Sequence, residues 1–225
     1  LTGDDFYING DFYFGTKQTL TRMAKILTHD AKNPEIDVKN GFATLCDDFF
    51  IGDRAFNEFV IPVVKASTGK RSTCLFPYDR AGKLIPYGTL EKNRSVIDHY
   101  HKNETRLKER SLTDRNEWYG FGRTQGIQDV YKKKYSVCPI IKGLEDLKIT
   151  LCDKGVGVYG GLYILTNIGE QAIKEVLLTD DFMEYVSLLG KYKSGGYYTF
   201  SSKDLKRYLC YRLSERNDLE KNNRF

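Results

Sequence analysis

The chain has 225 residues, of which 40% are hydrophobic and 29% charged, as in a globular protein of one large or two small domains. No apolar run approaches the ~20 residues of a membrane helix, and no signal peptide is visible, so we expect a cytoplasmic protein without a membrane partner. The net charge is +5, but residues 1–60 hold six Lys/Arg against ten Asp/Glu. The remaining residues therefore carry +9, which favours a polyanionic partner for this later part of the chain; the alternative is a basic surface that is only solvated.

The N-terminal part predicts a β-hairpin followed by a helix. Residues 1–15 are rich in Phe, Tyr and Asp around an Asn-Gly turn signal at 9–10. Thr16 or Thr19 can cap a helix that runs to about Thr28.

The next part predicts strands and hairpin-like units. The expected elements are, in order, two strands joined by a turn at 40–41 within 36–52, a strand at 59–67, and a hairpin-like unit at 75–88. Pro62 lies within the second of these segments, so we expect an edge strand or a bulge there.

A polar helix is predicted from Arg94 to about Arg110, with Ile97, Tyr100 and Leu107 on its narrow apolar face. The later expected elements are strands at 135–141, 147–153 and 156–165, helices at 168–178 and 181–190, a glycine-rich loop at 190–201 that leads into a strand, and a short helix capped by Ser202 that ends near Leu209. For the second of these helices we expect a cap at Asp180 or Asp181 and a stop at Gly190. Residues 214–225 read as a polar tail that frays.

These elements predict an α+β fold with antiparallel or mixed sheets and several helices, in a single domain of residues 1–225. The five cysteines form no CxxC pair, so we expect reduced, mostly buried thiols. His99 and His101 lie two apart, but their neighbours do not make a metal site, and we expect no metal. The sequence begins at Leu1, which suggests a processed chain or a fragment of a longer protein.

The segment 118–126, WYGFGRTQG, holds the only tryptophan and three glycines. Trp118, Gly120, Gly122 and Gly126 are expected to shape a loop, because glycine permits sharp turns and close approach. Such a loop leaves Arg123 and Gln125 to present donors and acceptors that suit phosphate or bases. The alternative is a glycine-rich connection whose arginine is only solvated.

A basic cluster follows this segment. Residues 102–134 hold nine Lys/Arg and five Asp/Glu, and end in Lys132, Lys133 and Lys134. Aromatic residues are interleaved with these cations, which is the composition expected of a nucleic-acid surface. A second glycine, aromatic and lysine loop contains Lys193, Gly195 and Gly196.

The sequence does not contain several common catalytic motifs in full. Residues 155–160 match GxGxxG, but an apolar strand-like run follows where a dinucleotide site needs a helix. No glutamate has lysine two positions later, as a common metal-dependent nuclease would require. The five prolines include no adjacent pair, so the N/D-P-P-Y/F motif of amine methyltransferases is not present.

Seven strings in order nevertheless resemble one family. They are NGFATLCDDFFIG (40–52), VIPVVKAS (60–67), LFPYDRAGKLIP (75–86), RLKERS (106–111), WYGFGRTQG (118–126), VYGGLYIL (158–165) and SGGYYTFSSKDL (194–205). Together they are similar to the C-terminal target recognition (specificity) domain of TaqI-like, gamma-class, adenine-specific DNA methyltransferases. The resemblance covers roughly residues 15–210 and leaves residues 1–14 unplaced.

The resemblance implies a DNA-binding domain of a type II restriction-modification system, in some relatives fused to a restriction enzyme. Its partners would be double-stranded DNA and an N-terminal catalytic methyltransferase domain of the same polypeptide. That domain would bind S-adenosylmethionine, so this chain alone would hold no cofactor and catalyse no DNA methylation, whereas its parent would be an enzyme. The target adenine would be flipped into the catalytic domain.

The expected DNA-binding residues are Arg123, Gln125, Lys132, Lys133, Lys134 and Lys193, and none is expected to be catalytic. Because the shared strings recur in relatives with different sites, Arg123 and Gln125 are expected to contact phosphate or to fix the loop. Base readout is expected in 127–135 or 142–157. The alternatives are a stand-alone nuclease, a specificity subunit of a restriction system, and an RNA-binding or protein-interaction module.

Overall fold

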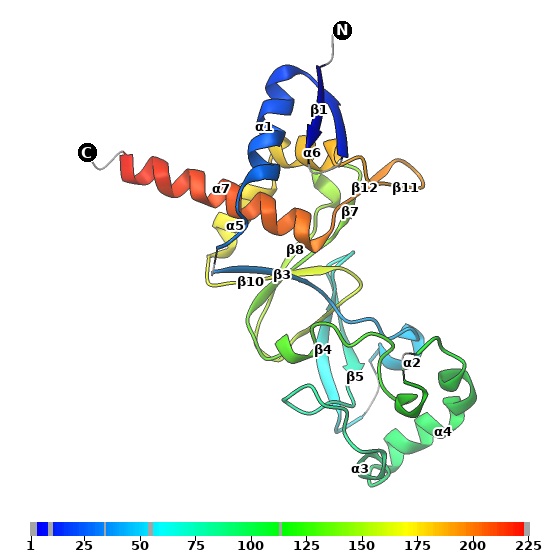
Figure 1. Ribbon diagram of the computed structural model, residues 1–225. Helices are drawn as coiled ribbons and strands as arrows, with labels where there is room; N and C mark the ends of the chain where they lie inside the picture. Colours follow the sequence, from blue (N-terminus) through cyan, green and yellow to red (C-terminus); the bar gives the residue numbers. More distant parts are fainter. Residues whose placement is uncertain (1–3, 9–10, 34, 54–55, 113, 223–225) are drawn as a thin grey trace. The chain divides into compact units, whose positions relative to one another are not determined.

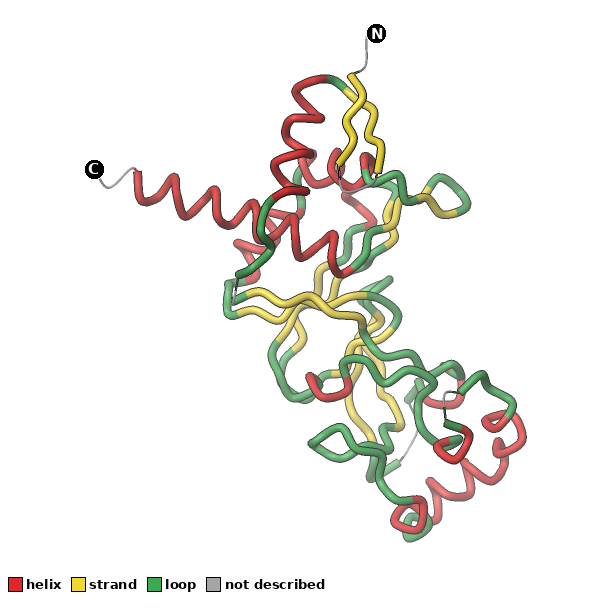
Figure 2. The backbone as a smooth tube through the Cα atoms, viewed as in Figure 1, coloured by secondary structure: helices red, strands yellow, loops and turns green. Residues whose placement is uncertain are grey.

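A computed structural model describes the backbone of residues 4–8, 11–33, 35–53, 56–112 and 114–222, and the side chains of 12–33, 35–53, 56–112 and 114–216. Helices and strands are interspersed along this part of the chain, and its sheets are antiparallel or mixed (Figures 1 and 2). The predicted α+β class is confirmed. None of the helices in these ranges is long and apolar enough to cross a membrane.

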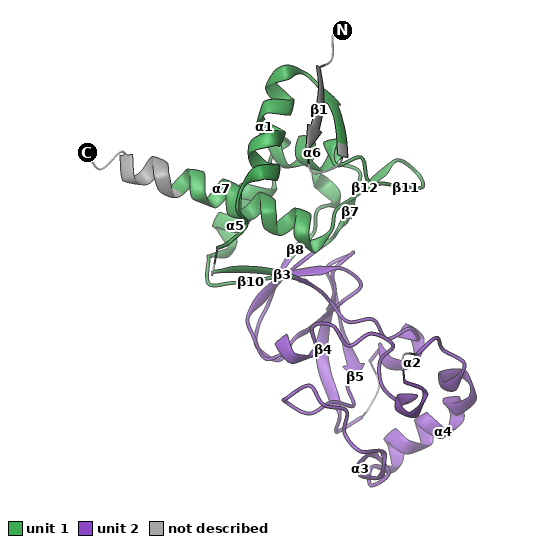
Figure 3. Cartoon of the chain, in the orientation of Figure 1, with its two compact units in different colours: residues 1–38, 138–149, 164–225 green, residues 39–137, 150–163 purple. Residues whose placement is uncertain are grey.

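The chain divides into two compact units (Figure 3). Unit 1 comprises residues 1–38, 138–149 and 164–225, and unit 2 comprises residues 39–137 and 150–163. Each unit is therefore built from segments that lie far apart in the sequence, which composition alone does not reveal.

The strands are β1 Asp4–Ile8, β2 Asp11–Gly15, β3 Ile36–Asn40, β4 Val60–Lys65, β5 Lys70–Leu75, β6 Lys134–Val137, β7 Ile140–Ile141, β8 Ile149–Cys152, β9 Gly157–Tyr159, β10 Leu162–Thr166, β11 Tyr192–Lys193 and β12 Tyr197–Thr199. The α-helices are α1 Lys17–Thr28, α2 Asp47–Phe50, α3 Tyr87–Leu90, α4 Arg94–Lys108, α5 Glu170–Leu177, α6 Asp180–Leu188 and α7 Ser202–Asn222. Short 3-10 helices are η1 Arg115–Glu117, η2 Ile127–Asp129 and η3 Leu144–Asp146. The sheets have the strand orders β1-β2, β3-β10-β6-β8, β11-β12-β7 and β5-β4-β9.

The hairpin and first helix of unit 1 confirm the sequence prediction. β1 and β2 pair antiparallel with Ile8 opposite Asp11, and the Asn-Gly turn between them lies outside the described residues. Thr16 caps α1, because its side-chain oxygen accepts a hydrogen bond from the Thr19 amide at 3.2 Å. Leu20 and Met23 are buried on the inner face of α1.

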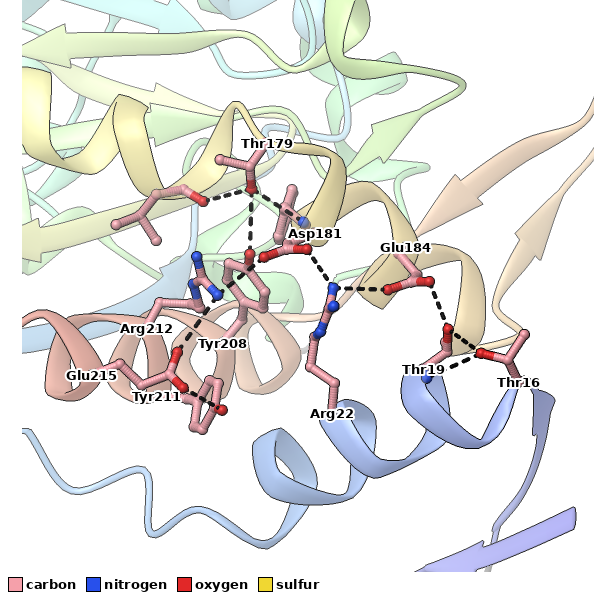
Figure 4. Close-up of polar contacts among 12 residues, drawn as sticks. Thr16, Thr19, Arg22, Thr179, Asp181, Glu184, Tyr208, Tyr211, Arg212 and Glu215 are labelled. Atoms are coloured by element: carbon pink, nitrogen blue, oxygen red, sulfur yellow. Dashed lines mark hydrogen bonds and ion pairs between the residues drawn. The ribbon is translucent and has the colours of Figure 1, made fainter. Parts of the chain in front are cut away.

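A polar network joins three helices of unit 1 (Figure 4). Arg22 on α1 pairs with Asp181 and Glu184 on α6, and Asp181 also pairs with Arg212 on α7 at 3.1 Å. The cap of α6 is Thr179, whose hydroxyl accepts from the Phe182 amide at 3.2 Å. The predicted cap at Asp180 or Asp181 was therefore wrong. Asp181 instead forms ion pairs with Arg22 and Arg212.

The last helix is longer than predicted. Ser201 and Asp204 form a reciprocal cap at its start, in which Asp204 accepts from the Ser201 amide at 2.7 Å and the Ser201 hydroxyl accepts from the Asp204 amide at 3.3 Å. The prediction of an end near Leu209 was wrong, because Tyr208, Leu209 and Leu213 continue a buried stripe at helical spacing. The polar residues 214–222 remain helical.

Unit 2 contains a mixed three-stranded sheet and an aromatic core. β4 pairs antiparallel with β5 and parallel with β9, so β4 is central, contrary to one predicted option of an edge strand. β9 pairs only with residues 63–65 of β4, which leaves Pro62 just outside that parallel ladder. The predicted hairpin-like turn is present, with Tyr78 bridged to Leu84.

The expected second strand of segment 36–52 was wrong. β3 is followed by single bridges at Phe42 and Ala43 and then by the short helix α2. The reason is local: the Thr44 hydroxyl accepts from the Cys46 amide at 3.1 Å and donates to Asp47, which starts a helical turn. The predicted helix from Arg94 is confirmed as α4, and all five cysteines are free and buried.

Candidate nucleic-acid interface

The loop 118–126 is held in unit 2 by the aromatic core. Phe121 is buried and stacks on Phe42 at a ring distance of 4.7 Å, with the rings of Phe50 and Phe76 at 5.1 and 5.8 Å. Its amide donates to the Tyr78 hydroxyl at 2.6 Å. Burial raises the pKa of Tyr78, so this hydroxyl stays protonated at neutral pH. The core therefore fixes the middle of the loop.

Arg110 also holds this loop, and no role was predicted for it from the sequence. Its guanidinium donates to the carbonyl oxygens of Leu107 and Gly120 at 3.0 and 2.9 Å and to those of Thr44 and Trp118. It also lies over the Phe50 ring at 5.3 Å. In the sequence, Arg110 is the last arginine of RLKERS (106–111), one of the seven strings that resemble the family.

The glycines of the loop are required by close contacts. A Cβ on Gly122 would lie 2.3 Å from the Leu45 side chain, and one on Gly120 would lie 2.8 Å from the Tyr78 hydroxyl. Gly126 has a φ of +79° and lies against the Tyr163 ring, so a side chain there would be both strained and crowded. Trp118 is half-buried beneath Lys108, whose Nζ lies 5.0 Å from the indole ring.

Arg123 and Gln125 are exposed at the end of this fixed loop. The backbone of Arg123 pairs with Ala43 in both directions, at 2.9 and 3.0 Å. Within the described part of the chain, no hydrogen bond or ion pair holds the Arg123 guanidinium. The structure therefore presents an exposed cationic side chain on a backbone held by hydrogen bonds, an arrangement that suits a phosphate contact.

Lys134 departs from the predicted set. It is only 1% exposed, and its Nζ donates to the carbonyl oxygens of Asp129, Val130 and Lys132 at 2.8, 3.1 and 2.9 Å. All three ammonium donors are thus used inside the protein. Desolvation lowers its pKa to about 8, against the opposing charges of Cys152 and Asp129. The expected DNA contact at Lys134 is corrected to a structural role.

Asp129 organises the same turn. Its carboxylate is 5% exposed and accepts from Lys39, Lys132 and Tyr163, each at 2.8 Å. Burial alone would raise the pKa of Asp129, but the hydrogen bonds from Lys132, Lys39 and Tyr163 outweigh it and hold the pKa at about 2. The turn that carries Lys132 and Lys133 is therefore fixed by a buried carboxylate and a buried ammonium.

Several exposed polar side chains surround this turn. The Arg80 guanidinium lies 5.7 Å from the Tyr131 ring, and the Gly82 position lies against Gln128, so the loop 79–83 packs on η2. The turn 153–156 is joined to the segment that follows η2, because the Gly155 amide donates to the Val130 carbonyl at 3.0 Å. We define the basic face as the exposed residues Arg80, Lys83, Arg123, Gln125, Gln128, Tyr131, Lys132, Lys133 and Lys154. Asp79 and Asp153 are exposed acids within the same loops.

The other predicted contacts lie in unit 1. Lys193 is exposed on β11, and Gly195 and Gly196 form the following loop with φ values of +79° and +77°. The structure therefore places Arg123, Gln125, Lys132 and Lys133 in one unit and Lys193 in the other. His99 stacks on Phe49 at 4.2 Å, with its Nε2 3.1 Å from the Phe49 carbonyl oxygen.

Charge is unevenly shared between the units. By sequence, unit 2 has 19 Lys/Arg and 13 Asp/Glu, a net charge of +6, whereas unit 1 has 16 and 17, a net charge of −1. The basic excess thus belongs to the unit that carries the basic face.

No known family model matches the chain, and no curated protein matches it significantly.

Proposed function

We propose that this chain is the sequence-specific DNA recognition domain of an adenine-specific DNA methyltransferase of a type II restriction-modification system. The observation that carries the proposal is the basic face of unit 2, where exposed cations stand on loops fixed by Arg110, Asp129 and Lys134. Fixed loops with exposed cationic side chains suit a polyanion of regular geometry, because little loop order must be gained on binding.

Phosphate contacts and base contacts are assigned to different residues of the basic face. Arg123, Lys132 and Lys133 supply phosphate contacts, which position the protein on the duplex without reading sequence. Within 127–135, only Gln128, Tyr131, Lys132 and Lys133 are exposed, so Gln128 and Tyr131 are the side chains available for base readout in that segment. Gln pairs in a two-pronged fashion with adenine in the major groove.

The chain alone is proposed to transfer no methyl group. Its sequence has no adjacent prolines and so lacks the N/D-P-P-Y/F device that holds a flipped adenine in the family it resembles. S-adenosylmethionine would bind the N-terminal catalytic domain of the parent protein, in the cytoplasm. A filter assay with tritiated methyl donor should show no incorporation into DNA, and calorimetry should show no cofactor binding. Either signal above background would contradict the proposal.

The phosphate assignment is tested with Arg123→Ala. This variant should bind duplex DNA more weakly on every sequence and lower the salt slope by about one. Fluorescence anisotropy across a salt series and a panel of duplexes measures both quantities. A changed preference at one base position would instead make Arg123 a base-reading residue.

The position of the face is tested by removing two charges at a time. Lys132→Ala with Lys133→Ala should lower affinity more than Lys17→Ala with Lys25→Ala, although the net charge changes equally. At roughly fivefold per lost phosphate contact near 0.15 M salt, the first pair should lose about 25-fold. Equal losses in both pairs would mean that binding follows net charge and not this face. Urea unfolding of each variant controls for the lost ion pair between Lys132 and Asp129.

A further inference from the structure

Unit 1 contains a two-stranded β-ribbon, whereas the basic face of unit 2 is formed by loops. We define it as residues 191–199, in which β11 pairs with β12 and the Thr199 amide donates to the Lys191 carbonyl at 2.8 Å. The loop 194–196 contains two glycines with positive φ, so the turn is tight and carries little side-chain bulk. Figure 1 shows this hairpin projecting away from the helices of unit 1.

The ribbon combines exposed aromatic and cationic side chains. Tyr192 is 66% exposed and its ring lies 5.5 Å from that of Tyr198, while Lys193 is exposed beside it. Lys142 on the neighbouring segment lies 5.1 Å over the Tyr197 ring. Residues 190–203 contain three lysines and no acid in the sequence.

Two acids near the ribbon, Asp204 and Asp146, are engaged by hydrogen bonds. Asp204 is buried and accepts from Lys191 at 2.6 Å and from Ser201. Asp146 accepts from the Lys142 amide at 2.8 Å. The projecting end of the ribbon therefore presents positive charge and aromatic surface, whose natural complement is a polyanion with stacked bases.

The dimensions of the ribbon match one groove of DNA. Its two strands lie about 4.8 Å apart, and the arm from Lys191 to the loop projects about 10 Å at roughly 3.3 Å per residue. The B-DNA major groove is about 12 Å wide and 8.5 Å deep and admits a two-stranded ribbon, whereas the minor groove is only about 6 Å wide. The arm is thus long enough to reach base edges.

We propose that the β11–β12 ribbon is a second DNA contact, which enters the major groove of a duplex with Tyr192 and Lys193 at its leading edge. This inference rests on the proposed function, because it assumes that duplex DNA is the partner. Lys193 contacts a phosphate at the groove edge, and Tyr192 contacts base edges or the thymine methyl group.

The test compares the full chain with a Tyr192→Ala, Lys193→Ala variant on two duplexes. Both duplexes carry one sequence enriched by the wild-type chain from a random pool; one contains cytosine and the other glucosylated 5-hydroxymethylcytosine. The glucose fills the major groove and leaves the phosphate charge unchanged. The wild-type chain should bind the glucosylated duplex at least about tenfold more weakly, and the variant should show a clearly smaller difference between the two duplexes, because the base-reading residues of the basic face are unchanged. Lys17→Ala is the charge-matched exposed control, and thermal unfolding confirms that the variants fold.

The other outcomes contradict the ribbon proposal. Equal weakening of wild type and variant by glucose would show that the ribbon is not the segment in the groove, and no weakening of either would place the protein on the backbone or minor groove. A variant that loses binding to single strands but not to duplex would make the ribbon a single-strand contact. If the wild-type chain binds no duplex at all, the proposed function itself fails. If Lys132→Ala with Lys133→Ala weakens binding and the ribbon variant does not, the function stands and the ribbon proposal falls.

Discussion

Replacing Arg110 tests whether the loop that presents Arg123 is held as the structure indicates. The guanidinium donates to four carbonyl oxygens and lies over Phe50. Of these acceptors, the Thr44 carbonyl keeps a second donor, the Gly122 amide at 3.3 Å. Arg110→Met therefore deprives the loop of its main polar support while conserving much of the apolar stem.

The magnitude follows from those contacts. Two carbonyls of the loop, at Trp118 and Gly120, lose the guanidinium donor, at about 1–3 kcal/mol each, and the ring contact adds about 0.5–1 kcal/mol. We expect Arg110→Met to lower the free energy of unfolding by about 3–5 kcal/mol. Arg110→Lys should recover only part of this, because one ammonium cannot reproduce the planar fork.

Urea unfolding followed by circular dichroism measures both variants, with Arg115→Ala as the matched control. Arg115 is exposed on η1, so its removal changes the net charge equally and should cost less than about 0.5 kcal/mol. Where the Arg110 variants are still folded, their affinity for duplex DNA should also fall, since the backbone that carries Arg123 is no longer fixed. A loss below about 1 kcal/mol for Arg110→Met would refute this account of the loop.

Two further variants test the buried charges of the neighbouring turn. Lys134→Met should lower the free energy of unfolding by about 1–3 kcal/mol, because the Lys132 carbonyl loses its ammonium donor; no loss in urea unfolding would contradict the structural role. The pKa of Asp129 is depressed to about 2 from an ordinary 3.8, so its stabilisation is present above pH 4 and is lost as pH falls through 2. The stability advantage of wild type over Asp129→Asn should therefore shrink by about 2 kcal/mol between pH 5 and pH 2, and a pH-independent difference would show that the carboxylate charge is not the cause.

Periodicity and cap residues predicted most of the elements. The Thr16 cap and the stripe Ile97, Tyr100 and Leu107 depend on residues a few positions apart, so they are visible in the sequence. The failures have tertiary or competing local causes. The second strand expected within 36–52 rested on apolar content, but the Thr44 hydroxyl starts a helical turn that buries Phe49 and Phe50.

The exposure of Arg123 and Gln125 agrees with the sequence prediction, but the residues that hold their loop were not predicted. The prediction rested on the aromatic residues of the loop, which were expected to anchor it to the core, and Phe121 is indeed buried there. Nothing local separates Lys134 from Lys132 and Lys133, because its burial depends on carbonyls gathered by the turn 129–132. Arg110 was missed for the same reason, since its acceptors come from two further segments of the chain.

The most direct test of the central claim is a salt titration of duplex binding by the wild-type chain. Its basic face offers the cations Arg80, Lys83, Arg123, Lys132, Lys133 and Lys154, so three to six phosphates should be neutralised. Fluorescence anisotropy with a random-sequence duplex should give a dissociation constant of about 10⁻⁴–10⁻⁶ M near physiological salt, and log K should fall with log salt at a slope of about −3 to −5. Absent binding, or binding that does not change with salt, would contradict the assignment of this face to DNA.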